Sequence, residues 1–114
     1  MTARIYVPAT RPLLAAWFEA AAVPGDAERV MSNGDDEDSE YDALLTAAEL
    51  ALALRPDDGR RVVLVAETGR GEADGAVPLR QWVAVHCDVA DRAADADPDD
   101  DLGWFAVQEI PDLI

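Results

Sequence analysis

Hydrophobic positions along the chain follow two different periods, and each change of period predicts a new element. Apolar side chains in every second position, or in short unbroken runs, indicate strands, whereas apolar side chains three or four positions apart indicate helices. The pattern predicts strands at 4–8, 28–32, 62–66, 82–89 and 103–107, a helix that starts at Thr10 and stops at Pro24-Gly25, a helix with its apolar stripe over 41–54, and a short helix at 92–96. Residues 109–113 are expected to form a closing turn, because Pro111 would break a helix that ran through it.

Both long helices carry local start and stop signals. In the first, the Thr10 hydroxyl can cap the first-turn amides and Pro12 suits an early helical position, and the apolar stripe comprises Leu13, Leu14, Trp17, Phe18 and Ala21. In the second, acidic residues precede the helix and Arg55 follows it, which complements the helix dipole at both ends, and the stripe comprises Tyr41, Leu44, Leu45, Ala48 and Leu52, widened by Leu50 and Leu54. We therefore expect the leucine-rich stripe of the second helix to be well buried.

The Val-rich run at 62–66 has the unbroken hydrophobicity of a central strand covered on both faces. The order of elements, β-α-(β)-α-β-β-(α)-β, predicts an α+β fold (α/β-like), with one mixed sheet of four to five strands and two main helices packed on it. A chain of 114 residues has room for one such domain, which spans 1–114. The acidic or polar segments 33–40, 67–76 and 95–101 are expected to be exposed loops.

Charge is the strongest feature of the composition. The chain has 24 acidic residues against 9 basic ones, which gives a formal net charge of -15. Such a chain is repelled by phosphate backbones and by anionic membrane surfaces, so we expect neither a nucleic-acid partner nor a membrane partner. The same charge favours a solvated surface or the attraction of a basic protein partner.

The cellular compartment follows from what the chain lacks. No apolar run reaches membrane-spanning length, and the opening residues MTARIYVPAT have no apolar stretch of signal-peptide length. The lone Cys87 cannot form an intramolecular disulfide, which fits a reducing compartment. These features predict a cytoplasmic protein.

Three segments carry a family resemblance: the opening RIYVPAT, the segment VPLRQWVAVHCD and the ending WFAVQEIPDLI. Together they resemble a family of small, acidic actinobacterial proteins of unknown function. The resemblance spans nearly the whole chain, with the acidic loops as the variable parts. It implies a compact cytoplasmic α/β domain and transfers no site residue.

His86 is the sole histidine, and Cys87 and Asp88 follow it directly. Neighbouring side chains on a strand point to opposite faces, so His86 and Cys87 cannot act as a catalytic dyad. Asp88 shares the face of His86 and could orient its imidazole, but no serine or threonine is placed to be activated. The alternative is that His86 has a purely structural role, with its hydrogen-bonding groups satisfied inside the fold.

Metal binding has little support in the sequence. A single histidine without a second histidine or cysteine nearby is a poor zinc site. The alternating Asp95, Asp97, Asp99 and Asp101 begin like a calcium loop but lack its later glycine and glutamate. We therefore expect no metal and no cofactor.

Thr10 and Arg11 occupy the place between the first strand and the first helix. Ligands of open α/β sheets gather beyond the carboxyl ends of strands, where helix N-termini present unpaired amides to anions. A hydroxyl, a guanidinium and free amides at this place could hold a phosphate or a carboxylate. The alternative is ordinary helix capping by Thr10 beside a surface arginine.

Three tryptophans stand at structured positions. Trp17 fits the core face of the first helix, whereas Trp82 and Trp104 lie on strand faces that could be core or interface. If Trp82 or Trp104 is exposed beside acidic residues, it marks an interface, because aromatic anchors carry much of the binding energy between proteins.

Two functional hypotheses follow, and the sequence favours the first. The first is a non-enzymatic interaction or accessory domain whose acidic surface meets a basic protein partner or a second copy of the chain, and it predicts an exposed apolar patch flanked by acids. The second is a small enzyme or anionic-ligand-binding domain, and it requires Thr10, Arg11 and His86 to converge in one pocket. A nucleic-acid mimic would need carboxylates spaced like phosphates along one face.

Overall fold

The computed structural model describes residues 2–32, 36–69, 71, 73–93, 96–97 and 100–114. Over these residues the chain forms an α+β domain on a five-stranded antiparallel sheet with the spatial order β3-β1-β4-β6-β7. Its strands are β1 (Thr2–Ala9), β3 (Val30–Met31), β4 (Val62–Gly69), β6 (Trp82–Cys87) and β7 (Gly103–Ala106). The α+β class and the central place of the Val-rich strand are as predicted, whereas the described strand pairs are antiparallel rather than mixed.

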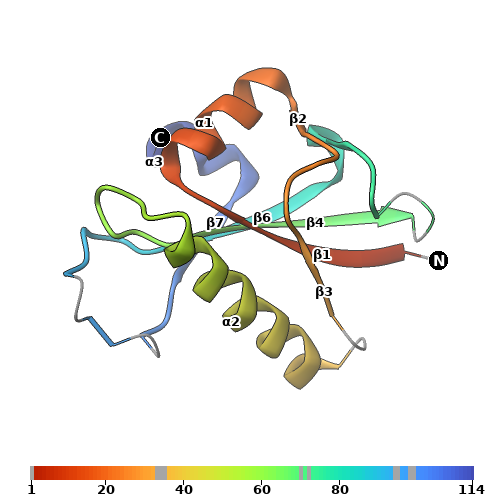
Figure 1. The fold of residues 1–114 in the computed structure, drawn as a ribbon. Helices are drawn as coiled ribbons and strands as arrows, with labels where there is room; N and C mark the ends of the chain where they lie inside the picture. The colour runs from red at the N-terminus through yellow and green to blue at the C-terminus, as the bar shows by residue number, and fades with distance from the viewer. Residues whose placement is uncertain (1, 33–35, 70, 72, 94–95, 98–99) are drawn as a thin grey trace.

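Helices cover both faces of the sheet (Figure 1). One face carries α1 (Arg11–Ala20), the one-turn α3 (Ile110–Leu113) and a small second sheet of β2 (Ala22–Val23) and β5 (Val77–Pro78). The other face carries α2 (Glu37–Ala53), which packs against β1, β3 and β4. None of the helices in the described ranges is both long enough and apolar enough to cross a bilayer.

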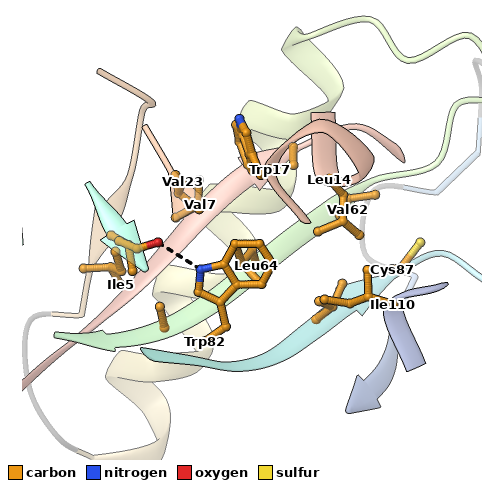
Figure 2. Close-up of a cluster of buried hydrophobic side chains, with 14 of the residues drawn as sticks. Ile5, Val7, Leu14, Trp17, Val23, Val62, Leu64, Trp82, Cys87 and Ile110 are labelled. Atoms are coloured by element: carbon orange, nitrogen blue, oxygen red, sulfur yellow. Dashed lines mark hydrogen bonds between the residues drawn. The ribbon is translucent and has the colours of Figure 1, made fainter. Parts of the chain in front are cut away.

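The main core lies between the sheet and α1. Ile5, Val7, Val62 and Leu64 alternate along β1 and β4 toward this face, where they meet side chains of α1, β2, β5 and α3. Figure 2 shows this cluster, including the Trp82 indole, whose Nε1 donates a hydrogen bond of 3.1 Å to the Val77 carbonyl oxygen. That bond satisfies the polar atom of a buried tryptophan and ties β6 to the small second sheet.

The start of α1 follows its local sequence. The Thr10 Oγ1 accepts a hydrogen bond of 3.3 Å from the Leu13 N–H, and Pro12 lies in the first turn. The helix ends at Ala20, before the predicted stop at Pro24-Gly25, because Ala21 adopts a left-handed conformation with φ 59° and the chain then enters β2.

The α2 helix begins earlier than predicted and buries a different face. Asp36 caps it by accepting a hydrogen bond of 3.1 Å from the Ser39 N–H, so residues 37–40 are helical rather than loop. The buried side chains are alanines, whereas the leucines of the predicted stripe are half-buried and Tyr41 and Leu54 are exposed. The helix therefore rests on the sheet through small residues: Ala43, Ala47, Ala48 and Ala51.

A bulge in β6 changes which side chains share a face. Val65 pairs with Ala84 but Ala66 pairs with Trp82, so Val83 is an extra residue opposite β4. Strict alternation along the predicted strand 82–89 would place Trp82 on the face of Ala84 and His86, but the bulge turns Trp82 into the core cluster that also contains Val85 and Cys87. Val83, which strict alternation would place with Val85, is exposed instead.

Several predicted boundaries shift in the second half of the chain. β4 continues through Gly69, so residues 67–69 belong to the strand, and the segment after β6 is not helical at Arg92 or Ala93. After β7 the chain forms a 3-10 turn (Val107–Glu109) and then α3, whose Pro111 lies in the first turn, where the missing N–H costs nothing. Residues 94–95 and 98–99, on which parts of the predicted short helix and of the aspartate loop fall, lie outside the described residues.

Candidate functional site

A cavity of about 440 Å³ opens between the start of α1, the segment that follows α2 and the end of α3. These three segments lie at the same end of the sheet (Figure 1). The polar lining comes from Thr10, Arg11, Arg55, Asp57 and Asp58. The apolar lining comes from Pro12, Ala15, Leu54, Pro56 and Ile114.

Arg11 is fixed within the lining by two partners. Its Nε donates a hydrogen bond of 2.6 Å to the Leu113 carbonyl oxygen, and its NH1 lies 3.3 Å from the Asp58 Oδ2. The other carboxylate oxygen of Asp58 accepts a hydrogen bond of 2.9 Å from the Arg60 N–H. Arg11 therefore holds α1, α3 and the segment after α2 together, and its charge is already matched inside the protein.

Arg55 has a different environment. It follows the helix end with φ 56°, in the left-handed region, and its N–H donates a hydrogen bond of 2.9 Å to the Leu52 carbonyl oxygen. Glycine usually occupies this position after a helix, and a side chain there costs about 1 kcal/mol. Among the described residues the Arg55 guanidinium has no hydrogen-bond or ion-pair partner, and this exposed residue lines the cavity.

His86 does not line this cavity. It is paired with Val63 on β4 and Trp104 on β7, on the sheet face opposite to Val62 and Cys87. Burial lowers the pKa of the His86 imidazole below its ordinary value, so the ring is neutral at pH 7. The structure thus brings Thr10 and Arg11 to one cavity and places His86 elsewhere.

Asp88 is not available to orient His86. Its two carboxylate oxygens accept hydrogen bonds from Arg61, whose backbone N–H, Nε and NH2 lie 2.8, 2.9 and 2.8 Å from them. Arg61 is thus the partner of Asp88, and Arg60 is the partner of Asp91 at 3.0 Å.

Cys87 is buried beneath α1 and has the properties of a core residue. Burial, reinforced by the charge of Asp88, raises the pKa of the Cys87 thiol to about 11. Such a thiol is scarcely ionised at neutral pH and is a weak nucleophile. Its hydrogen donates to the Asp88 carbonyl oxygen at 3.3 Å.

The two strand tryptophans have opposite environments. Trp82 is buried in the core, so its indole is not exposed to a partner, whereas the side chain of Trp104 is 62% exposed on β7. Trp104 lies on the sheet face that carries α2, whose main contacts are with β1, β3 and β4. We call the group formed by His86, Trp104 and Ala106 the Trp104 face.

Sequence reasoning missed Arg55 and Asp57 as lining residues of the cavity. Their segment, Arg55 to Gly59, has the composition of a turn, and nothing local indicates that it closes against residues more than forty positions earlier. The one available signal is an arginine where glycine is usual after a helix. No group of three or more histidine, cysteine, aspartate or glutamate side chains within the described ranges is placed to hold a metal ion.

Fold and site together define a small, strongly acidic α+β domain with a lined cavity at one end of its sheet and an open tryptophan-bearing face at the edge. The chain belongs to DUF6912, a family of unknown function, whose sequence profile matches residues 3–114. The predicted likeness to a family of unknown function is thereby confirmed. Comparison with curated proteins and comparison with solved structures found no match.

Proposed function

We propose that this protein is a non-enzymatic interaction domain that binds a basic protein segment through the Trp104 face. The observation that carries the proposal is the exposure of Trp104, at 62%, on the edge strand β7, away from the strands that α2 mainly contacts. Exposed tryptophans are costly to hydrate and are enriched among the residues that dominate binding energy. Trp104 is therefore the anchor that we assign to the interface.

The surroundings of Trp104 add to its suitability as an anchor. His86 lies directly across from it on β6, and the lowered pKa of this half-buried imidazole keeps it uncharged at pH 7. Ala106 on the same strand is small, which leaves the indole ring accessible. The face thus offers an aromatic and apolar centre without a positive charge.

Charge decides which kind of partner fits this centre. The chain carries a net charge of -15, and the exposed Asp100 and Asp101 lie just before β7. A second copy would bring an equal negative charge to the contact and be repelled, whereas a lysine- or arginine-rich segment is attracted and reaches the surface faster. We therefore assign the face to a basic partner rather than to self-association.

The test uses a synthetic peptide of alternating lysine and valine, with a peptide of alternating glutamate and valine as its counterpart. Binding is followed by tryptophan fluorescence and by calorimetry at low salt and at about 0.5 M sodium chloride, where screening shortens the reach of charge. We expect the lysine peptide alone to bind, with an affinity that falls steeply with salt. Trp104→Ala should weaken binding by at least about tenfold.

The matched control is Met31→Ala. Met31 is 44% exposed on β3, the opposite edge strand of the same sheet. The Met31→Ala protein keeps the net charge of the wild type and its Trp104 face, and it loses an exposed apolar side chain elsewhere. Equal binding by wild type, Trp104→Ala and Met31→Ala would show that charge alone holds the peptide, and would refute the assignment. Sedimentation of the wild type showing a dimer that Trp104→Ala abolishes would replace the basic partner by a second copy.

A further inference from the structure

We infer that the cavity beside Arg55 is a binding site for a small zwitterion with an apolar body, of the kind of an apolar amino acid. Arg55 would hold the ligand carboxylate and Asp57 its ammonium group. The inference is independent of the Trp104 face, because none of the residues that line the cavity belongs to that face.

The size and lining of the cavity fit a small organic ligand. A volume of about 440 Å³ lies within the range of ordinary ligand pockets, which combine apolar walls with a few polar groups that fix orientation. Here Pro12, Ala15, Leu54 and Pro56 provide an apolar wall, and charged side chains lie beside it. An apolar body with a charged end matches this division.

The charged groups of the lining divide into a matched pair and an unmatched pair. Arg11 and Asp58 lie 3.3 Å apart and bind each other. The side chains of Arg55 and Asp57, both exposed residues, have no partner among the described residues. A ligand that carries one positive and one negative group satisfies both of them, whereas a simple anion would be opposed by Asp57 and a simple cation by Arg55.

Among the arginines that the structure describes, Arg55 and Arg80 have side chains without a hydrogen-bond or ion-pair partner, and of these two only Arg55 lines the cavity. Most of the others have an acidic partner, and Arg29 donates to the carbonyl oxygens of Ala73 and Gly75. The acid-paired arginines are Arg4, Arg11, Arg60, Arg61 and Arg92. Arg55 is therefore the described arginine of the cavity lining whose charge is available to a ligand.

The backbone at Arg55 strengthens this assignment. Glycine would relieve the left-handed conformation at φ 56°, yet the position carries the longest cationic side chain. A strained residue in a cavity wall is consistent with a role that the fold alone does not require. Replacing Arg55 by glycine should therefore raise the stability of the protein and weaken ligand binding.

The test titrates the protein with leucine and two matched relatives, 4-methylpentanoate, which lacks the amine, and 3-methylbutylamine, which lacks the carboxylate. Binding is followed by the backbone amide resonances of lining residues such as Ala15 and Asp58, with Trp104 as a reference outside the cavity. Valine and phenylalanine extend the series to other apolar bodies. We expect the amino acids to shift the lining resonances and both truncated relatives to bind at least about fivefold more weakly, because each loses one charge-assisted contact.

Two variants separate the roles of the charged groups. Arg55→Gly should weaken leucine binding about tenfold while raising the thermal midpoint by about 3–6 °C, because glycine accepts the left-handed backbone. Asp57→Asn should weaken leucine binding but leave 4-methylpentanoate unchanged or better bound. Arg80→Ala, at an exposed arginine that does not line the cavity, is the control and should change neither property.

Three results would overturn the inference. No shift of the lining resonances with any of the three amino acids means that the cavity is not such a site. Equal affinity of wild type and Arg55→Gly removes the guanidinium from recognition. Equal affinity for leucine and 4-methylpentanoate removes the ammonium group, and with it the zwitterion. None of these results bears on peptide binding at the Trp104 face.

Discussion

Arg61 and Asp88 form a buried ion pair at the point where β4 begins and β6 has ended. The Arg61 NH2 lies 2.8 Å from the Asp88 Oδ1, and the two side chains are 1% and 7% exposed. The same guanidinium donates a hydrogen bond of 2.8 Å to the Asp100 carbonyl oxygen, and the Arg92 Nε lies 3.7 Å from the Asp88 Oδ2. The pair therefore fastens the acidic segment between β6 and β7 to the central strand.

Removing one member of this pair should be strongly destabilising. Asp88→Ala leaves a buried guanidinium without its counter-charge, which typically costs about 3–5 kcal/mol. We expect this loss in the free energy of unfolding measured with urea. The control is Glu67→Gln, which breaks the exposed pair with Arg4 at 2.6 Å and should cost no more than about 1 kcal/mol. Similar costs for the two variants would mean that burial does not distinguish the pairs.

Asp88 should also give the protein an acid-sensitive component of stability. Burial raises the pKa of Asp88, but the hydrogen bonds and charge of Arg61 outweigh burial and lower the pKa below its ordinary value of 3.8. A carboxyl whose pKa is lower in the folded state stabilises the fold above its unfolded pKa, and that contribution is lost as the pH falls through the folded pKa. The contribution of Asp88 to the free energy of unfolding should therefore be complete above about pH 5 and be lost as the pH falls from there to about 2.

The comparison for this effect is the double variant Arg61→Met with Asp88→Asn. It removes both buried charges and keeps an oxygen that can accept the backbone N–H of residue 61. Other acids titrate equally in both proteins, so the wild type should lose more stability than the double variant over the same pH interval. Parallel pH profiles would show that Asp88 does not have a lowered pKa.

The sequence predicted those parts of the fold that local patterns determine. Thr10 caps α1 and the Val-rich run is the central strand, because capping chemistry and an unbroken apolar run need no knowledge of distant residues. The β6 bulge at Val83 escaped prediction, since a single extra residue opposite β4 shows only when the two strands are paired. That one residue reversed the faces of Trp82 and Val83.

The candidate site was predictable in part for the same reason. Thr10 and Arg11 line the cavity because the turn from strand to helix places them at the end of the sheet. Arg55 and Asp57 join them only through the way in which α2 lies across the sheet, which has no local signature. His86 was grouped with Thr10 on chemistry alone, and strand alternation sets it on the other face.

The contact of α2 with the sheet depends on alanine, contrary to the expectation from the leucine stripe. Ala47 of α2 is 0% exposed and belongs to the buried cluster that also contains Tyr6, Val63 and Val65 of the sheet. Small side chains here let the helix approach the strands closely, so Ala47→Leu should push the helix off the sheet and cost about 1–3 kcal/mol. Unfolding by urea measures the loss. Ala53→Leu makes the same exchange at an exposed position of α2 and should change stability by less than about 0.5 kcal/mol.

Cys87 should behave as a concealed thiol whose reactivity reports unfolding. The pKa of about 11 that burial gives it means that only about one thiol in a thousand is ionised at pH 8. We expect no measurable reaction of the native protein with Ellman's reagent on the time scale of minutes, and prompt release of one equivalent in urea. Asp88→Ala, which loosens the segment that begins beside the thiol, should react faster under native conditions. Native wild type reacting as fast as a free cysteine would contradict both the burial of Cys87 and its raised pKa.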